Sequence, residues 1–388
     1  MRDVAARGET LPLESLALPA ATEPNRARLA RSLELLLAGG LTALVFPLAW
    51  ALRAVLGLDD AEYVFGFTTF YAAFVVNDPH FSVTYLLFYD GFRRRAFGAD
   101  VPRAQRLRAI LAGIVVPVVL ASWASAAIAL RSAPSLGAMI ELMFLLVGWH
   151  YAKQGFGVFT VLASRRGVTV TPTERRVVLA HAFAGWAFAW ANPAVPAREL
   201  EEKGVVYWGL AHPRWLELGA GAVLAVSTLA LAAVMLARLR RDGRAFAWGP
   251  LALFLVTVWL WTIFSSLDPL VRYVIPALHS VQYLYFVWLL RRNQARAEEG
   301  PPAFGRPVAV RVGGLAALAL ALGFVFFHGA PAFLDGGLVR ASRGGAVTRA
   351  LGDTPYWAAI YVVVNIHHYF MDHVIWRREN AETRYLRG

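Results

Sequence analysis

Residues 355–378 read PYWAAIYVVVNIHHYFMDHVIWRR, a stretch long enough to cross a lipid bilayer as a helix. The second half of this stretch nevertheless carries five polar or ionisable side chains: Asn365, His367, His368, Asp372 and His373. Such groups are costly inside a membrane, so they usually face a protein interior and mark a functional site. The stretch therefore indicates a transmembrane helix that also carries a buried polar site.

The composition is that of a membrane protein. Of the 388 residues, 58% are hydrophobic and 16% are charged, and the mean hydropathy is +0.49. Soluble domains are nearer a quarter charged. Apolar stretches of about twenty residues recur along the chain, and they are too long and continuous for barrel strands. We therefore predict an all-α fold, a polytopic transmembrane helical bundle.

Clusters of arginine between the apolar stretches predict the topology. With the N-terminal tail in the cytoplasm, about ten crossings place nearly all clusters on the cytoplasmic side and the acidic loop around Glu201 outside. The net charge of +12 then reflects membrane orientation, and we expect no nucleic-acid partner. We predict a multi-pass protein of a bacterial inner membrane with both termini cytoplasmic. Residues 1–28 and 379–388 are the predicted cytosolic tails, and 29–378 the transmembrane domain.

The predicted spans differ in regularity. They are residues 32–52, 62–89, 107–130, 134–163, 176–191, 215–237, 247–267, 269–290, 308–327 and 355–378. The second contains Asn77-Asp78-Pro79, and Asn or Asp before proline is a favourable helix start, so we expect this span to be broken there. The backbone groups freed by a break need protein or a polar cavity around them. Residues 329–353, rich in glycine, are predicted to form a loop.

Three further spans carry a histidine deep in an apolar stretch, at His80, His150 and His279. At 1.5 Å per residue, these and the pair His367 and His368 lie roughly 14 to 22 Å from the cytoplasmic edge. The four spans also run in the same direction in the predicted topology. We therefore predict that they converge on one buried metal site. His367 points about 100° away from His368 on the helix, so we expect one primary ligand from that pair, and we favour His368.

Each histidine has an amide side chain three or four residues away, on the same helical face. In the order of the histidines, these amides are Asn77, Gln154, Gln282 and Asn365. Metal-bound imidazoles commonly donate their second N–H to such groups, so we expect the amides to support the site. The candidate catalytic residues are Asp372, Lys153 and Tyr151, and we expect the ammonium group of Lys153 to have a depressed pKa or a partner such as Asp372 or Asp78. We expect His181, His212 and His328 to be interfacial or structural.

The donor set limits the chemistry. The chain has no cysteine, which leaves histidine, carboxylate and amide as ligands. Imidazoles suit iron, copper or zinc rather than magnesium or calcium. We expect iron, with zinc, copper or haem as alternatives. A buried site reached from the lipid phase predicts a lipid or isoprenoid substrate. The predicted function is a non-haem iron oxidoreductase of the oxygenase, hydroxylase or desaturase type, with an electron-donor protein as a candidate partner.

The placement of single histidines on separate spans, at His80, His150, His279 and His368, resembles the architecture of the bacterial Brp/Blh-type carotene dioxygenases. This resemblance implies oxidative cleavage or modification of a polyene. Membrane fatty-acid desaturases and hydroxylases are likewise histidine-rich and multi-spanning. Their HxxxH and HxxHH boxes differ in spacing from the HHxxxxH pattern at residues 367–373.

Two other classes of function remain open at the level of sequence. Two of the four histidines could hold one haem axially, as in an electron-transfer protein. Alternatively, the broken second span, Lys153 and the turn from Asp372 to His373 could line the path of a transporter or a proton. The histidines could also be independent partners in interhelical hydrogen bonds.

Overall fold

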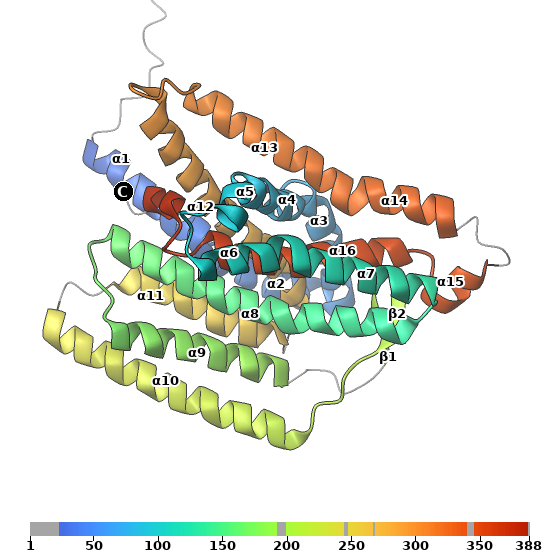
Figure 1. Ribbon diagram of the computed structural model, residues 1–388. Helices are drawn as coiled ribbons and strands as arrows, with labels where there is room; N and C mark the ends of the chain where they lie inside the picture. The colour runs from blue at the N-terminus through green and yellow to red at the C-terminus, as the bar shows by residue number, and fades with distance from the viewer. Residues whose placement is uncertain (1–22, 192–198, 244–246, 267, 340–344, 387–388) are drawn as a thin grey trace, which may run out of the picture.

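The computed structural model describes residues 23–191, 199–243, 247–266, 268–339 and 345–386. Within these residues the protein is helical, apart from one antiparallel hairpin of β1 (Glu199–Glu202) and β2 (Val205–Trp208). The all-α prediction is confirmed, with this hairpin as its exception. Long helices run side by side along the molecule in Figure 1.

The helices follow one another along the chain with short breaks. They are α1 (Glu23–Leu35), α2 (Thr42–Leu56), α3 (Leu58–Ala73), α4 (Asn77–Tyr89), α5 (Phe92–Phe97), α6 (Arg103–Ile110), α7 (Val116–Ala129), α8 (Ala133–Arg165), α9 (Pro172–Ala191), α10 (Arg214–Asp242), α11 (Trp248–Leu255), α12 (Pro269–Glu299), α13 (Val308–Phe324), α14 (Ala330–Leu334), α15 (Ala346–Leu351) and α16 (Pro355–Ile375). Segments of π-helix join several of them: η1 (Leu36–Gly40), η2 (Leu111–Val115), η4 (Val256–Ile263), η6 (Val325–Gly329) and η7 (Asp335–Val339). Two 3₁₀ segments are η5 (Phe264–Ser266) and η9 (Ala381–Leu386).

Five helices are long and apolar enough to cross a membrane: Arg103–Ala129, Ala133–Arg165, Arg214–Asp242, Leu270–Glu299 and Val308–Val339. A sixth is present if Arg28–Gly40 and Thr42–Leu56, which are bent by 51° at their junction, count as one span. The ten spans predicted from sequence are not shown.

The shortfall has a physical cause in the remaining stretches. The second predicted span is divided between α3 and α4, and the 13 residues of α4 are fewer than the roughly 20 that a bilayer requires. The seventh predicted span forms only the shorter apolar helix Trp248–Ile263. Both α9 and α16 are about long enough, but their histidine and charged side chains lower their hydropathy.

The predicted break in the second span is confirmed. Helix α3 ends at Ala73, and α4 begins at Asn77, with Asp78 and Pro79 in its first turn. Proline is tolerated there because the first-turn N–H groups have no intrahelical partner. The chain also bends at Gly39, whose φ of 133° favours glycine, and the sequence analysis did not predict this bend.

The predicted loop at residues 329–353 is wrong over its first part. Helix continues from α13 through η6, α14 and η7 to Val339, so that Val308–Val339 forms a single long apolar element. Glycines lower helix propensity by only about 1 kcal/mol each, which the flanking apolar residues can override. Helix α15 then occupies part of the remaining stretch.

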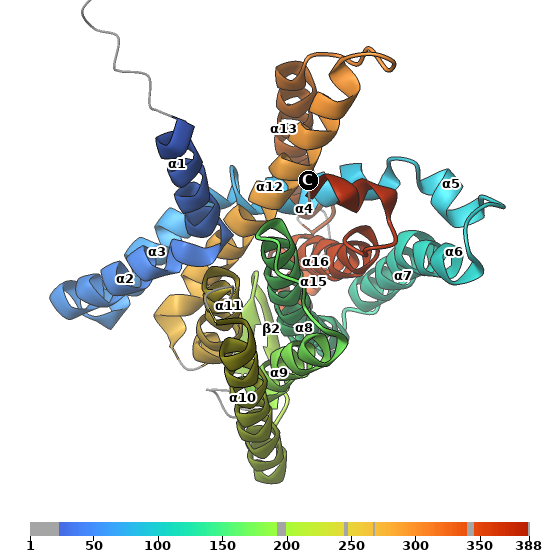
Figure 2. The ribbon, with the colours of Figure 1, turned by 90° about the vertical axis from the view of Figure 1, so that its left-hand side faces the viewer.

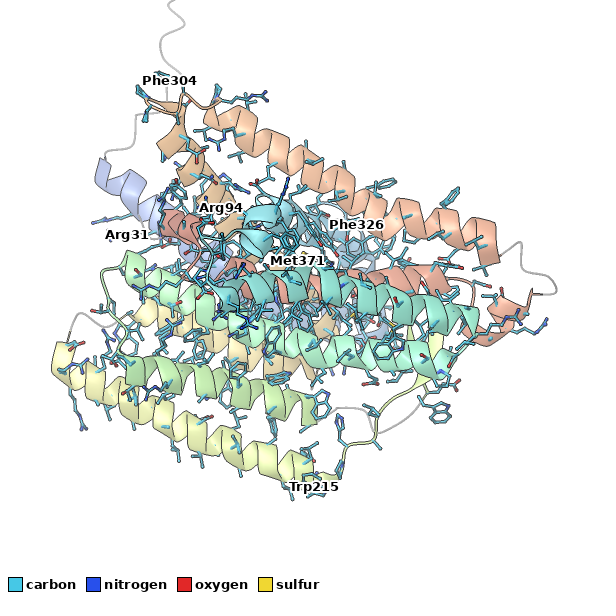
Figure 3. The ribbon with its side chains drawn as sticks, in the orientation of Figure 1. Arg31, Arg94, Trp215, Phe304, Phe326 and Met371 are labelled. Carbon is cyan, nitrogen blue, oxygen red and sulfur yellow. The ribbon has the colours of Figure 1, made fainter. Side chains whose placement is uncertain are left out.

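Helix α16 lies near the middle of the bundle, where it packs against α4, α7 and α8. The view along the bundle in Figure 2 shows α4, α8, α12 and α16 grouped centrally, while α2, α10 and α13 project outward. In Figure 3, Met371 of α16 marks this interior, and its side chain is fully buried. The outer helices instead expose many large apolar side chains, among them Leu44, Val55, Val226, Leu229 and Leu318. Such surfaces suit contact with lipid.

Both described ends of the chain lie at one end of the bundle (Figure 1). The Arg165 side chain at the end of α8 donates hydrogen bonds to Glu34 of α1 at 2.9 Å and to the carbonyl of Leu386 in η9 at 3.3 Å. Asn293 of α12 donates to the carbonyl of Tyr385 at 2.8 Å. The segment at 381–386, part of the predicted C-terminal tail, is therefore packed against α8 and α12.

Candidate metal centre

The four central helices bring together one histidine each: His80 from α4, His150 from α8, His279 from α12 and His368 from α16. One ring nitrogen from each lies within 4.8 Å of the others. No side chain among the four is more than 3% exposed. The predicted convergence of these spans is therefore confirmed, and the structure places His368 rather than His367 in the group.

The four imidazoles form a closed ring of neighbours. His80 contacts His279 and His368 with ring centroids 4.9 and 4.4 Å apart. His150 contacts the same two residues, at 4.9 Å each. All four rings thus surround one point between the helices.

Several nitrogens in this group have no hydrogen-bond partner within the described part of the chain. They are Nε2 of His80, Nδ1 of His279 and both ring nitrogens of His368. Buried polar atoms are almost always paired, because an unpaired group costs about 1 to 3 kcal/mol. In addition, Nε2 of His150 lies 3.2 Å from Nε2 of His279. Lone pairs that face one another without protons between them fit a shared cation, and neutral imidazole is the commonest protein ligand for metals.

A hydrogen bond on the outer side of one ring and a nearby carboxylate on the outer side of another favour this inward orientation. The Ser280 hydroxyl donates to Oδ1 of Asn77 at 3.0 Å, which leaves its oxygen to accept from Nδ1–H of His80 at 3.3 Å. Nδ1 of His150 lies 3.8 Å from Oδ2 of Asp372. A proton on Nδ1 leaves Nε2 of each ring as the free donor atom, the usual arrangement around a bound metal.

Asp372 stands beside the histidine group rather than in it. Its Oδ1 accepts hydrogen bonds from the Tyr283 hydroxyl at 2.6 Å and from Nε1 of Trp376 at 3.1 Å. Its Oδ2 lies 3.6 Å from Nε2 of His368 and 3.8 Å from Nδ1 of His150. This carboxylate is thereby held in place to receive a proton or to orient two of the rings.

Two of the predicted supporting amides reach the site through another residue. Asn77 is linked to His80 by Ser280, as described above. Asn365 accepts from the Tyr369 hydroxyl at 3.1 Å, and the Tyr369 ring stacks on His150 with centroids 4.8 Å apart. The sequence pattern indicated neither Ser280 nor Tyr369 as an intermediary. Ser280 follows its own histidine directly and contacts the histidine of another helix, so local spacing carries no signal for it.

The other two amides tie helices together instead. Gln154 donates to Oε1 of Gln282 at 2.8 Å, and Gln282 donates to the carbonyl of Ala38 at 2.6 Å. That carbonyl lies next to Gly39, where the chain bends. Among the hydrogen bonds of the described residues, neither glutamine contacts an imidazole side chain, so their predicted support of the ligands stays a prediction.

The adjacent histidines of α16 have separate environments. His367 lies between the Tyr85 hydroxyl, 3.0 Å from Nδ1, and the Ala112 carbonyl, 2.9 Å from Nε2. Both of its nitrogens are thus engaged away from the four-histidine group, which corrects its inclusion among the candidate ligands. His373 lies one turn nearer the helix end, with Nε2 3.2 Å from a guanidinium nitrogen of Arg377.

Of the other two candidate catalytic residues, Tyr151 lies against the group, with its ring centroid 4.5 Å from that of His279. Lys153 pairs with neither of the two carboxylates named for it. No carboxylate among the described residues lies within ion-pair distance of its ammonium group, and Nζ lies 5.9 Å from the Phe183 ring centroid. Asp78, one of the proposed partners, instead pairs with His328 at 2.8 Å.

The histidines expected to be structural are engaged as such in two cases. Nδ1 of His181 lies 3.1 Å from the Ser227 hydroxyl, and Nε2 accepts from Nε1 of Trp259 at 3.2 Å. His328 pairs with Asp78, two residues before His80. Protein partners therefore satisfy the ring nitrogens that these two histidines use, and neither residue needs a metal ion to explain its position.

Two cavities reach the histidine group. The first, of about 550 Å³, is lined by His150 and Asp372 and by several arginines; we call it the basic cavity. The second, of about 420 Å³, is lined by His80 and His279; we call it the aromatic cavity. Its ring-bearing wall comprises Phe81, Phe144, Tyr151, Trp186, Trp190, Tyr207, Trp261, Tyr361 and Tyr369. His150 lines the first cavity, His80 and His279 line the second, and Tyr369 lines both, so the histidine group lies between them.

No protein-family model, curated protein or solved structure matches this chain. The chain is thus a helical protein with several membrane-length apolar helices and a buried group of four histidines that could hold a metal ion. The resemblance to carotene dioxygenases and desaturases stays a prediction.

Proposed function

We propose that the protein is a multi-pass membrane oxidoreductase whose four-histidine centre binds iron and acts on a hydrophobic substrate. The observation that carries this proposal is the convergence of His80, His150, His279 and His368 with ring nitrogens that lack protein partners. Four helices distant in sequence would gain nothing from burying unpaired imidazoles together. A shared metal ion supplies the missing partner for all of them.

The donor set favours a redox metal. Four neutral imidazoles bring no charge to the ion, and Asp372 lies outside the ring of nitrogens. Imidazole ligands suit iron, copper and zinc alike. Hydrolytic zinc sites commonly include three protein ligands and a water beside a general base, whereas iron held by imidazoles supplies one-electron and dioxygen chemistry. Elemental analysis decides among the three metals.

The residues around the centre have defined tasks in this proposal. The aromatic cavity receives the apolar part of the substrate beside His80 and His279 and excludes bulk water. Asp372, fixed by Tyr283 and Trp376, accepts or returns a proton at Oδ2. Tyr151 packs on the face of His279 and holds that ring in place.

The geometry disfavours haem. Two imidazoles can hold a haem only from opposite faces of the flat macrocycle, which must pass between them. The opposite corners of this group are His80 with His150, and His279 with His368. The space between either pair is occupied by the rings of the other pair, with neighbouring centroids 4.4 to 4.9 Å apart.

The proposal includes the topology predicted from sequence: about ten crossings of a bacterial inner membrane, with both termini cytoplasmic. The meeting of α1 and η9 at one end of the bundle supports it, because both ends of a chain with an even number of crossings lie on the same side. An electron-donor protein on that side is a candidate partner.

The deciding experiment is elemental analysis with an absorption spectrum of the purified protein in detergent. We expect about one iron per chain, no haem absorption, and strong loss of iron in alanine variants of each of the four histidines. His181→Ala is the matched control, because His181 is equally buried but fully hydrogen-bonded. Wild-type protein that neither contains nor takes up iron, zinc or copper would overturn the proposal. Haem absorption lost in two of the variants would replace it with the electron-transfer alternative.

A further inference from the structure

The basic cavity differs in charge from the aromatic one. Four cationic side chains line it, Lys153, Arg175, Arg377 and Arg378, against two carboxylates, Asp372 and Glu379. The aromatic cavity has one arginine, Arg272, and one glutamate, Glu141. Formal charge therefore favours an anion in the first cavity and gives no such preference in the second.

The two carboxylates of the basic cavity are already engaged. Glu379 accepts from Arg377 at 3.0 Å and also pairs with Arg108. Asp372 accepts from Tyr283 and Trp376 on its Oδ1 and faces the histidines with its Oδ2. Neither is available to neutralise the remaining cations.

Two of those cations have only aromatic partners. The Arg175 guanidinium carbon lies 4.9 Å from the Phe156 ring centroid, and Nζ of Lys153 lies 5.9 Å from that of Phe183. No carboxylate among the described residues lies within ion-pair distance of either. A cation–π contact attracts the cation but leaves its charge in place. Lys153 is also only half buried, so its ammonium group can reach a ligand in the cavity.

The rest of the lining combines polar side chains with a substantial apolar part. Trp149, Phe156, Val161, Phe286 and Trp376 contribute to its walls. The cavity joins the metal centre, at His150 and Asp372, to the end of the bundle where the C-terminal segment packs, at Thr383 and Leu386. The apolar side chains can contact a hydrocarbon chain, and Lys153 and Arg175 can pair with an anionic group. The cavity therefore suits a ligand that combines the two.

We propose that the basic cavity binds an anionic amphiphile, a hydrocarbon chain that bears a carboxylate or a phosphate. Lys153 and Arg175 hold the anionic group, and the hydrocarbon lies against Phe156 and its apolar neighbours. That this amphiphile is the substrate of the metal centre rests on the proposed function; its binding does not. The inference thereby narrows the hydrophobic substrate to one with an acidic group.

The test is isothermal titration of the purified protein, in a neutral detergent and with a chelator present, using oleate, dodecyl phosphate, oleyl alcohol and inorganic phosphate. We expect oleate and dodecyl phosphate to bind at least tenfold more tightly than oleyl alcohol, and more weakly at higher salt. Inorganic phosphate should bind far more weakly than dodecyl phosphate. Equal binding of oleate and oleyl alcohol would overturn the proposal, and equal binding of the two phosphates would overturn the amphiphile in favour of a free anion.

Charge variants locate the anionic group. Lys153→Gln and Arg175→Gln should each weaken oleate binding about tenfold, and Lys153→Arg should restore most of it. The matched control is Arg292→Gln, because Arg292 likewise lies over an aromatic ring, Trp288 at 4.8 Å, but does not line the cavity. Unchanged affinity in both glutamine variants, with the thermal midpoint retained, would refute the assignment.

A histidine variant separates this inference from the proposed function. His279→Ala removes a ring that lines the other cavity, so oleate should bind to it as to the wild type. If the wild-type protein binds oleate selectively but takes up no metal, the cavity assignment holds and only the proposed oxidoreductase function is refuted. If the wild-type protein takes up metal but does not bind oleate selectively, the cavity assignment is refuted and the proposed function is not.

Discussion

Replacing His368 by alanine should cost less stability than replacing the control residue His181 when no metal is present. With metal present, the variant should lack most of the stabilisation that the metal gives. Without metal, the imidazole of His368 makes no hydrogen bond through either nitrogen in the described structure, so its removal breaks none. His181, the control, is equally buried at 0% exposure, and it has partners on both nitrogens, Ser227 and Trp259. Both substitutions remove the same imidazole side chain. The difference between their losses of unfolding free energy therefore reports the hydrogen bonds of His181.

The expected magnitudes follow from these contacts. His181→Ala forfeits two hydrogen bonds of about 0.5 to 1.5 kcal/mol each, so it should destabilise the metal-free protein by about 1 to 3 kcal/mol more than His368→Ala. With iron at a hundred times its dissociation constant, the wild type and His181→Ala should each gain about 2.7 kcal/mol. If the loss of one ligand weakens affinity about a hundredfold, the gain of His368→Ala falls to about 0.4 kcal/mol.

The assay is thermal unfolding in detergent, followed by circular dichroism, with chelator or with iron(II) under anaerobic conditions. Iron should stabilise His181→Ala by about 2.3 kcal/mol more than His368→Ala, and the two variants exchange rank if the hydrogen bonds of His181 contribute less than that. The reasoning is refuted if iron raises the midpoint of His368→Ala as much as that of the wild type. It is refuted equally if His368→Ala is the less stable variant with chelator present.

Three further predictions concern the same site and the membrane. The double variant of His279 and His368 should lose little more metal affinity than either single variant, because the ligands share one ion; additive losses in chelator competition would indicate independent sites. Ser280→Ala should weaken metal affinity about 10 to 100-fold, because Nδ1 of His80 loses its hydrogen-bond partner. Gln282→Ala should lower the thermal midpoint and leave the metal content unchanged. Equal effects of the two variants on metal affinity would contradict these roles. Reporter fusions after Glu201 and at the C-terminus should report opposite sides of the membrane, and a common side would break the predicted topology.

The spacing of residues on single helices determined much of the site. Asn77 before Asp78 and Pro79 specifies a helix start because proline lacks an N–H, and α4 begins there. The common depth of the four histidines follows from a fixed rise per residue and a fixed membrane thickness. Helical periodicity indicated a single ligand from the pair His367 and His368, and Asn365 and Asp372 on the face of His368 favoured that residue. These features are local, so a sequence states them directly.

Other features depend on which helices become neighbours. The link from Ser280 to His80 and the hold of Tyr283 on Asp372 join residues far apart in the chain. Lys153 lines the same cavity as Asp372 without pairing with it, because packing set the direction of α8. Hydropathy counts apolar residues and does not report where a helix ends, so five or six of the described helices, rather than ten, are long and apolar enough to cross a membrane.

The sequence by itself thus determined a helical chain, the break before α4 and the residues that could form a metal site. Only the tertiary structure decided that four of those residues meet within 4.8 Å, that Tyr85 and the Ala112 carbonyl engage His367, and that two cavities of different charge flank the group. The physical reason is that periodicity fixes a residue's depth and face on its own helix. The partner of that face is set by the packing of all the helices together.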